Sequence, residues 1–362
     1  MKKNNQKIAI VSAHEGSMSW KMTAKKITNN FQKSLNLSII TDIQYRTSSR
    51  LRRLFNRILI YFIFPIKVLL SKKKLARMDY IIVITSPFFL PLIITWLADK
   101  DKIIVLHNDL YPEGFYKIPY IKYFSNLFNP YKELNNKYLD GCRNHIYLSE
   151  NHAKLRTYNN QKVIFPPAVK RVQNNSSSFQ NNEPIKIGYC GTLGFNHAGL
   201  EFLDILKNSV FSSETEFHFH ISGAIAKLFS QKASKIRNKN NYSIIVSMPL
   251  IDSEYLKFMQ SLDFGLILLS AGSSDTVFPS KMAAHLSFGH PIILLSDGKN
   301  FLYEFINNHK IGYCINLDDQ NFFDFDDSIY NTFALYKNNA KNIFDKYFNY
   351  ESVSSQFLEL MN

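Results

Sequence analysis

Residues 263–296 read DFGLILLSAGSSDTVFPSKMAAHLSFGHPIILLS, and this stretch indicates the fold more clearly than any other part of the chain. Two short apolar runs, 264–269 and 292–295, have the length and aliphatic content of strands that are buried on both faces. Between them lie a small polar loop, 271–277, and a segment of helical length that ends at the turn Gly-His-Pro, 289–291. The order strand, loop, helix, strand is typical of a parallel α/β sheet.

The start of this helix is a candidate anion site. Pro279 suits the first helical position, because its missing N–H would have no partner there. The free amides that follow, together with the Ser280 hydroxyl and the Lys281 ammonium, can bind an anion such as a diphosphate. The alternative is an ordinary capped helix whose Lys281 is solvated.

Apolar runs alternate with helix-sized stretches along the whole chain. Residues 200–207 and 253–262 are two of the expected helices. The expected strands are 8–11, 81–84, 103–106, 163–165, 185–189, 217–221, 244–246, 264–269 and 292–295. This alternation predicts an α/β protein with doubly wound parallel sheets, which bind ligands at the carboxyl ends of their strands.

The length of 362 residues favours two domains. Residues 171–184 are a tract of Asn, Gln and Ser with few apolar side chains, and we place the linker there. The predicted organisation is an N-terminal domain over 1–170, a C-terminal domain over 185–340 and a last segment over 341–362. The last segment has apolar residues at helical spacing, and packing back on the N-terminal domain is one arrangement open to it.

A glycine-rich turn follows the first strand of the second domain. It reads IGYCGTLG over 187–194, with Gly188, Gly191 and Gly194 three residues apart. Glycines let a backbone approach a ligand closely. Their spacing fits neither a Walker loop nor the dinucleotide fingerprint, so the turn alone is a weak signal.

Three motifs together carry a resemblance: IGYCGTLG at 187–194, FPSK at 278–281 with GHPII at 289–293, and NDLYPE at 108–113. The chain resembles the retaining, family-four-like glycosyltransferases of the GT-B fold, especially those that assemble bacterial capsule and O-antigen polysaccharides. The motifs span both halves of the chain. The second is the most specific, since its order and spacing are similar to those of the family's donor-binding segment.

The resemblance implies a GT-B fold, in which two Rossmann-like domains face a cleft and a sugar passes from a nucleotide-sugar donor to an acceptor. The second domain would bind the donor. The residues implied there are Gly191, Thr192, Leu193, Asp275, Thr276, Pro279, Ser280 and Lys281.

The resemblance places the acceptor in the first domain. Gly16 and Ser17, after the first strand, are similar to the family's flexible loop on the acceptor side. Catalytic roles would fall to Lys281, Asp109 and His107. For Asp109 and His107 the alternative is a loop position satisfied by local hydrogen bonds.

The sequence departs from the family at one place. The wider family carries two glutamates eight positions apart around this helix, which hold the donor sugar and the ribose, and the matching positions here are Thr276 and Ala284. Asp275 lies beside the first position and could substitute for it, whereas the second has no obvious replacement. Donor affinity would then rest on phosphate contacts and backbone groups, or activity would be reduced or lost.

The mechanism implied by the resemblance is transfer with retention of configuration. Lys281 and the helix N-terminus would stabilise negative charge on the departing nucleotide diphosphate, without a metal ion. No cofactor is expected, since the nucleotide sugar is a substrate. Two alternatives stay open: a nucleotide-sugar epimerase of the same fold, and a non-catalytic membrane or complex subunit.

A basic, apolar stretch lies near the N-terminus, where no acid occurs between Asp42 and Asp79. Its apolar run, 58–70, is broken by Pro65 and Lys67 and is too short to span about 30 Å of hydrocarbon. We expect it to lie on an anionic membrane surface. The expected contacts are Arg50, Arg52, Arg53, Arg57, Lys72, Lys73 and Lys74. The alternatives are a solvated basic helix packed on its own domain and a nucleic-acid surface; no nucleic-acid module accompanies the charge, so no such partner is expected.

A second stretch, 80–98, is uncharged over a length that could just span a bilayer. Pro87 and Pro91 interrupt it, and it fits a buried strand, a turn and the start of a helix. We favour the strand, turn and helix over a membrane span.

Composition indicates the broad class of the protein and its expected location. Apolar residues make up 46% and charged residues 20%, which indicates a folded, soluble body. A formal charge of +14 favours anionic partners. Three widely spaced cysteines form no disulfide framework, and the apolar run 8–11 is too short for a signal peptide. The expected location is the cytoplasm, at the inner face of the cell membrane, with a lipid-linked glycan as acceptor.

Overall fold

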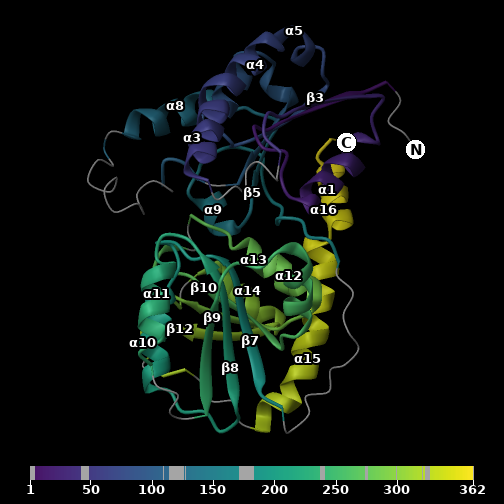
Figure 1. Ribbon diagram of the computed structural model, residues 1–362. Coiled ribbons are helices and arrows are strands. Elements are labelled where there is room, and N and C mark those ends of the chain that lie inside the picture. The colour runs from purple at the N-terminus through teal and green to yellow at the C-terminus, as the bar shows by residue number, and fades with distance from the viewer. Residues whose placement is uncertain are drawn as a thin grey trace. The chain divides into compact units, whose positions relative to one another are not determined.

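The computed structural model describes residues 5–41, 49–108, 110–113, 126, 128–170, 183–236, 241–273, 276–298, 300–319, 321–322 and 327–361. The chain forms two compact units. The first consists of Met1–Val169 with Asn349–Asn362, and the second of Lys170–Phe348. Each contains a six-stranded parallel sheet with helices around it (Figure 1). The Asn/Gln/Ser linker falls largely outside the described residues.

The sheet of the first unit has the strand order β2-β1-β3-β4-β5-β6. Its strands are β1 (Lys7–Val11), β2 (Lys33–Leu37), β3 (Tyr80–Ile84), β4 (Ile103–His107), β5 (Asn144–Tyr147) and β6 (Gln161–Val163). The helices are α1 (Met18–Thr28), α3 (Arg50–Ile58), the π-helix η1 (Leu59–Ile63), α4 (Phe64–Leu70), α5 (Lys72–Leu75), α6 (Leu90–Thr95), the 3₁₀-helix η2 (Lys100–Lys102), α8 (Asn129–Leu139), α9 (Glu150–Lys154) and α16 (Tyr350–Glu359).

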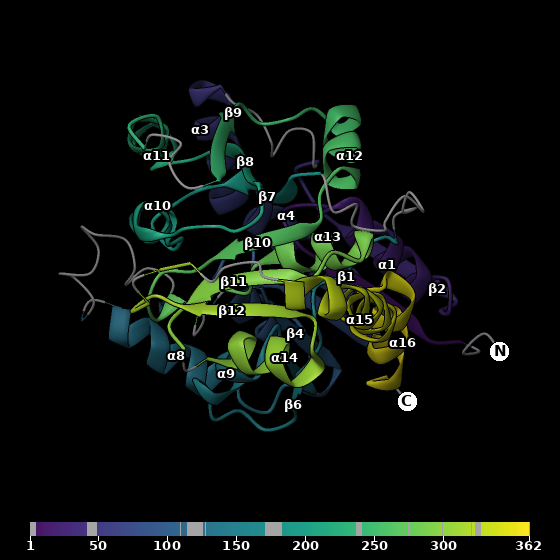
Figure 2. The ribbon, with the colours of Figure 1, turned by 90° about the horizontal axis from the view of Figure 1, so that it is seen from below.

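The sheet of the second unit has the order β12-β11-β10-β7-β8-β9. Its strands are β7 (Ile185–Thr192), β8 (Thr215–Ser222), β9 (Tyr242–Ser247), β10 (Phe264–Leu268), β11 (Ile292–Ser296) and β12 (Gly312–Asn316). The helices are α10 (Gly199–Asn208), α11 (Ala226–Ala233), α12 (Asp252–Gln260), α13 (Ser280–Phe288), α14 (Phe301–His309), α15 (Asp327–Ile343) and the π-helix η5 (Phe344–Phe348). In Figure 2 the strands β10, β11 and β12 follow one another in that order.

The central strands are those that the sequence predicts best. β3, β4, β10 and β11 are buried at every residue, which is why they read as unbroken apolar runs. The stretch 80–98 is confirmed as a strand, a turn and a helix, β3 and α6. Among the described residues no helix is long and apolar enough to cross a membrane.

Three strands escape the sequence pattern. β2 and β12 are edge strands in which exposed or half-buried residues outnumber buried ones, so neither forms an apolar run. β5 is only four residues long and begins with Asn144 and His145. β7 also runs to Thr192, so the glycine-rich segment expected as a turn after residue 189 belongs largely to the strand itself.

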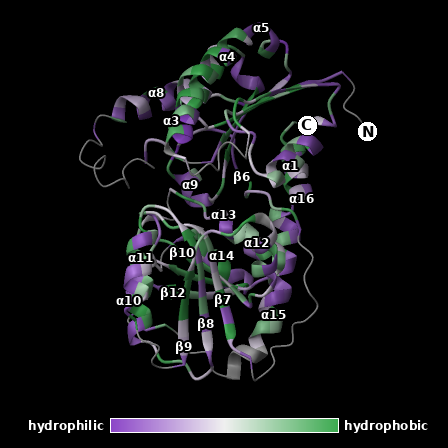
Figure 3. Cartoon of the chain, in the orientation of Figure 1, coloured by the Kyte–Doolittle hydropathy of each residue, from purple (hydrophilic) through white to green (hydrophobic). Residues whose placement is uncertain are grey.

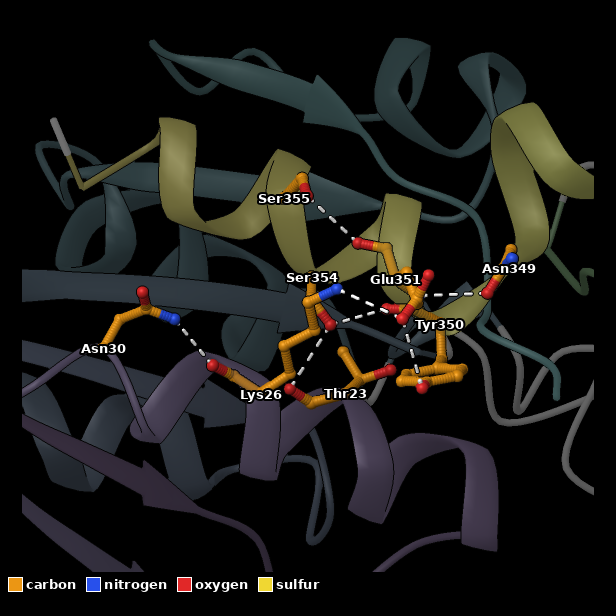
Figure 4. A network of polar contacts seen from close by, with 8 residues as sticks. All are labelled: Thr23, Lys26, Asn30, Asn349, Tyr350, Glu351, Ser354 and Ser355. Atoms are coloured by element: carbon orange, nitrogen blue, oxygen red, sulfur yellow. Dashed lines mark hydrogen bonds and ion pairs between the residues drawn. The ribbon is translucent and has the colours of Figure 1, made fainter. Parts of the chain in front are cut away.

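The end of the chain belongs to the first unit. α15 continues past the expected boundary at residue 341, and the chain enters the first unit at Asn349. There α16 packs on α1, with Phe357 against Trp20 at 5.8 Å between ring centroids. Polar contacts also link the two helices: Ser354 Oγ donates to the Thr23 carbonyl at 3.5 Å, and Lys26 forms an ion pair of 3.5 Å with Glu351 (Figure 4).

Phe357→Ala tests how far α16 stabilises the first unit. The Phe357 side chain is 1% exposed. Its loss leaves a cavity beside Trp20, so we expect the free energy of unfolding to fall by about 3–5 kcal/mol. Urea denaturation followed by tryptophan fluorescence measures the change. Ser355→Ala, on the exposed side of α16, is the control. An equal effect of both variants would contradict the view that Phe357 packing stabilises the first unit.

Candidate functional site

The loops of the second unit meet at one edge of its sheet. β7 is central, β8 lies on one side of it and β10 on the other, so the strand order reverses between β7 and β10, although the strands stay parallel. Such a reversal leaves a crevice at the carboxyl ends of the two strands, which is where ligands bind in open α/β sheets. The turn after β7 and the loop after β10 border this position.

Backbone hydrogen bonds join these loops into one rim. The Ser270 amide after β10 donates to the Asn196 carbonyl at 3.1 Å, and Leu193 N–H donates to the Ser222 carbonyl at 2.7 Å. The Leu193 side chain is fully buried. Leu193, predicted to contact the donor, therefore anchors the turn in the core. Gly223 follows with φ +112°, and a Cβ there would lie 2.6 Å from the Leu193 carbonyl oxygen.

Lys281 reaches across this rim from the first turn of α13. Its Nζ lies 4.9 Å from the centroid of the Tyr189 ring and donates to the Thr192 carbonyl at 3.4 Å. Gly191 has φ +130°, and a Cβ there would lie 3.0 Å from Lys281 Cε. Glycine at 191 thus leaves room for the lysine stem, and the structure brings Gly191, Thr192 and Lys281 together; their contact with a donor stays a prediction.

The ammonium of Lys281 is poorly compensated. Burial lowers the pKa of Lys281 to about 8, while the neighbouring Cys190 acts in the opposite direction. Within the part of the chain that the structure describes, no carboxylate lies within 4.0 Å of the Lys281 nitrogen. A half-buried cation without a counter-ion favours binding of an anion.

His197, which the sequence analysis did not single out, completes the arrangement. The Gly194 N–H donates to His197 Nδ1 at 3.1 Å, and burial lowers the pKa of His197 to about 4, so the ring is neutral. Because Nδ1 accepts, Nε2 carries the proton. His197 Nε2 lies 3.5 Å from Lys281 Nζ. Two donors therefore converge, and an acceptor oxygen placed between them would satisfy both.

The position of α13 is set by a close approach to β10. His285, one turn beyond Lys281, is buried with its Nδ1 3.3 Å from His290 Nδ1. A Cβ at Gly265 in β10 would lie 2.2 Å from His285 Cγ, so only glycine fits there. α13 ends at Gly289 in the left-handed conformation.

The other predicted donor residues occupy varied environments. Pro279 is the N-cap of α13, one position before its expected place in the helix, and Ser280 is exposed. Thr276 is buried, and its hydroxyl donates to the Ser273 carbonyl at 3.4 Å. Ala284 is half-buried on α13. Asp275 lies outside the described residues.

The first unit has the same kind of switch point, between β1 and β3. Gly16, with φ +84°, and Ser17 lie in the loop after β1. A Cβ at Gly16 would lie 2.5 Å from Trp20 Cδ1, and Ser17 Oγ caps α1 by accepting from the Trp20 amide at 3.3 Å. The structure therefore gives both residues a role in starting α1.

An open pocket of about 360 Å³ adjoins this loop. Its lining joins polar side chains with an apolar floor. It includes Ser12, Glu15, Lys21, Trp20, Ile10 and Leu37. Lys21 and Glu15 form an ion pair of 2.8 Å at its rim. The pocket has the mixed lining and size of a small-molecule subsite.

His107 lies buried at the end of β4. Its Nε2 is 3.1 Å from His145 Nδ1, and His145 Nε2 lies 3.1 Å from the Leu139 carbonyl, so the proton on each Nε2 points along this chain of bonds. Burial lowers the pKa of His107 well below its ordinary value. The adjoining cavity, about 10 Å³, is the size of one water. A catalytic role for His107 stays a prediction, as does that of Asp109, which lies outside the described residues.

Metal ligands are not grouped in the described part of the chain, where no three His, Cys, Asp or Glu side chains are placed to hold an ion.

Comparison with solved structures assigns the fold. HepE from Anabaena, in complex with UDP and glucose, has a TM-score of 0.63 and 12% identity over 99% of both chains. The fold is GT-B. Sucrose-phosphate synthase from Thermosynechococcus elongatus gives 0.61 and 10% over 99% of this chain and 98% of that one. The lipopolysaccharide outer core galactosyltransferase WaaB, in its apo form, gives 0.56 and 11% over 98% of this chain and 99% of that one.

The predicted α/β class, with two doubly wound domains of the GT-B type, is thereby confirmed. No protein-family model and no curated protein matches the sequence.

Gly265→Ala tests the packing that positions Lys281 in this GT-B domain. The added methyl overlaps the His285 ring, and we expect a loss of about 1–3 kcal/mol in the free energy of unfolding of the second unit. Chemical denaturation measures it. Gly194→Ala is the control, since the nearest atom to its new methyl would be 3.8 Å away. Equal stability of Gly265→Ala and the wild type would contradict this account of α13.

Proposed function

We propose that this protein is a glycosyltransferase that takes a sugar from a nucleotide diphosphate donor bound in the second unit. The observation that carries the proposal is the convergence of Lys281 Nζ and His197 Nε2, two donors 3.5 Å apart, at the switch point of the second sheet. A phosphate oxygen is an acceptor that can bond both at once. The first amides of α13 add further donors beside them.

Solved structures of the same fold support this choice of ligand. HepE is described in complex with UDP and glucose and with UDP-glucose. WaaB is described as a galactosyltransferase of the lipopolysaccharide outer core. These structures are only 10–12% identical to this chain. The proposal of a nucleotide-sugar donor is therefore argued from the candidate site of this chain together with its fold.

The proposed catalysis acts on the negative charge that develops on the leaving diphosphate during sugar transfer. Transfer breaks the bond between the anomeric carbon and the diphosphate oxygen, and the acceptor hydroxyl forms the new bond and passes its proton to the leaving diphosphate. Negative charge then grows on the leaving diphosphate. Lys281 and His197 would bond that oxygen more strongly as its charge rises, which lowers the barrier. The proposed reaction retains configuration at the anomeric carbon and requires no metal ion or cofactor.

The proposed acceptor is a lipid-linked glycan used in bacterial surface polysaccharide synthesis. The first unit offers a pocket of about 360 Å³ beside Gly16 and Ser17, with the Glu15–Lys21 ion pair at its rim. Carboxylate and ammonium groups are suited to bond sugar hydroxyls. Neither Thr276 nor Ala284 supplies a carboxylate, so the donor sugar would be held through other groups.

Nucleotide binding by point variants tests the donor site. Wild type should bind UDP or GDP in calorimetry and gain thermal stability from it. Lys281→Met should lower that affinity by about two orders of magnitude, in line with losing a charge-assisted bond, and His197→Leu by about one. The apo melting temperature of Lys281→Met should not fall, because the lysine is desolvated without a counter-ion.

Lys227→Met, an exposed lysine of α11 in the same unit, is the matched control. Unchanged affinity in Lys281→Met would refute the donor site. Nucleotide-sugar binding without transfer to any lipid-linked glycan would instead support a non-catalytic subunit.

The pH dependence of nucleotide binding follows from the pKa of Lys281. The side chain is charged below a pKa of about 8 and neutral above it. Affinity for the diphosphate should be constant from pH 7 to the pKa and then fall by about tenfold per pH unit. Lys281→Arg, which stays charged across this range, should show no such decline. An equal decline in both proteins would exclude Lys281 as the titrating group.

A further inference from the structure

The helical segment of residues 50–75 in the first unit has two apolar faces. α3, η1 and α4 run on without a break from Arg50 to Leu70, with a π-helical turn placed before Pro65. In Figure 3 this segment is largely green between the labels α3 and α4 and turns purple near α5. We call it the basic helical segment.

One face covers the sheet of the first unit. Ile60, Phe64 and Val68 recur four residues apart and are all buried. They belong to the same core cluster as Ile81 of β3 and Ile94 of α6. This packing alone would satisfy an amphipathic helix, whose opposite face is ordinarily polar.

The opposite face is apolar as well. A row of large side chains, each more than two fifths exposed, follows the helix in steps of one to four residues. These are Leu51, Leu54, Phe55, Ile58, Phe62, Ile63, Ile66, Leu69 and Leu70. Leu51 is 81% and Leu70 84% exposed. A contiguous apolar surface of this kind marks an interaction site, whereas single exposed apolar residues do not.

Positively charged side chains lie near both ends of this row. Arg52, Arg53 and Arg57 are exposed near one end, and Lys72, Lys73 and Lys74 near the other. None of these six forms an ion pair with a described acid. The sequence from 43 to 78 holds no acid at all, although the Arg50 side chain lies outside the described set.

We propose that the basic helical segment docks the protein on an anionic lipid bilayer, with its long axis in the plane of the surface. Leu51, Phe55 and Phe62 enter the headgroup boundary, and the flanking cations bond lipid phosphates. A bilayer presents negative charge above hydrocarbon, which matches both features. A second copy of the chain would set the same cations against each other, which disfavours a dimer through this face.

The proposal concerns the first unit and is independent of sugar transfer. Lipid binding is measured without any nucleotide or acceptor, so failure of the proposed enzymatic function would leave it intact.

Vesicle co-sedimentation of the full chain tests the proposal. The probe is a vesicle of phosphatidylglycerol and phosphatidylcholine, beside one of phosphatidylcholine alone. Wild type should bind the anionic vesicle, and binding should weaken as salt is added. On the neutral vesicle it should be at least tenfold weaker.

Two sets of substitutions separate the charges from the apolar row. Arg52→Gln/Arg53→Gln/Arg57→Gln should weaken partitioning about a hundredfold, at about fivefold per cation. Leu51→Ser/Phe55→Ser/Phe62→Ser removes the wedge and should weaken partitioning to anionic vesicles at least tenfold, even at low salt. All six side chains are exposed, so the melting temperature should stay unchanged.

Matched controls lie in the second unit. Lys227→Gln/Lys235→Gln/Lys257→Gln removes the same number of exposed charges, and Met248→Ser/Ile251→Ser removes exposed apolar side chains. Both controls should bind like the wild type. Equal losses in controls and test variants would overturn the proposal. So would vesicle binding that is unchanged while Leu51→Ser/Phe55→Ser/Phe62→Ser converts a dimer to a monomer in analytical ultracentrifugation.

Discussion

Parallel strand pairing is the constraint on which the candidate site depends. Parallel strands place all their carboxyl ends at one edge of a sheet, so the loops that follow them must share that edge. In the second unit the order β10-β7-β8 puts the turn after β7 beside the helix that follows β10. Lys281 and His197 are 84 residues apart in sequence and meet for this reason. Gly265 and Gly191 remove the side chains that would keep α13 and its lysine away.

Much of the fold could be read from the sequence, because buried parallel strands are apolar at every position. β10, α13 and β11 are local patterns, bounded by Pro279 and Gly289, and needed no knowledge of the rest of the chain. The edge strands β2 and β12 could not be found in this way, since each mixes polar with apolar residues and most of those residues are exposed or half-buried. The return of the chain to α1 through α16 depends on packing between Phe357 and Trp20, which no local pattern reveals.

The sequence pointed to some of the residues that the structure brings together at the candidate site, and missed others. Lys281 was singled out by its place at the start of a helix after Pro279, and the glycine-rich segment 187–194 by the resemblance. His197 was missed because its importance lies in a tautomer, which is fixed by a hydrogen bond from Gly194. Its one available signal was an imidazole three residues after the glycine-rich segment 187–194. His107 shows the reverse case: the resemblance implied a catalytic role, and the structure gives its ring a buried hydrogen bond with His145.

A crystal structure with a bound nucleotide diphosphate tests the central claim most directly. The account predicts a phosphate oxygen within hydrogen-bond distance, about 2.7–3.2 Å, of both Lys281 Nζ and His197 Nε2. It also predicts that the diphosphate lies at the carboxyl ends of β7 and β10. A diphosphate bound away from both side chains, with the Lys281 ammonium still in contact with the Tyr189 ring, would contradict it.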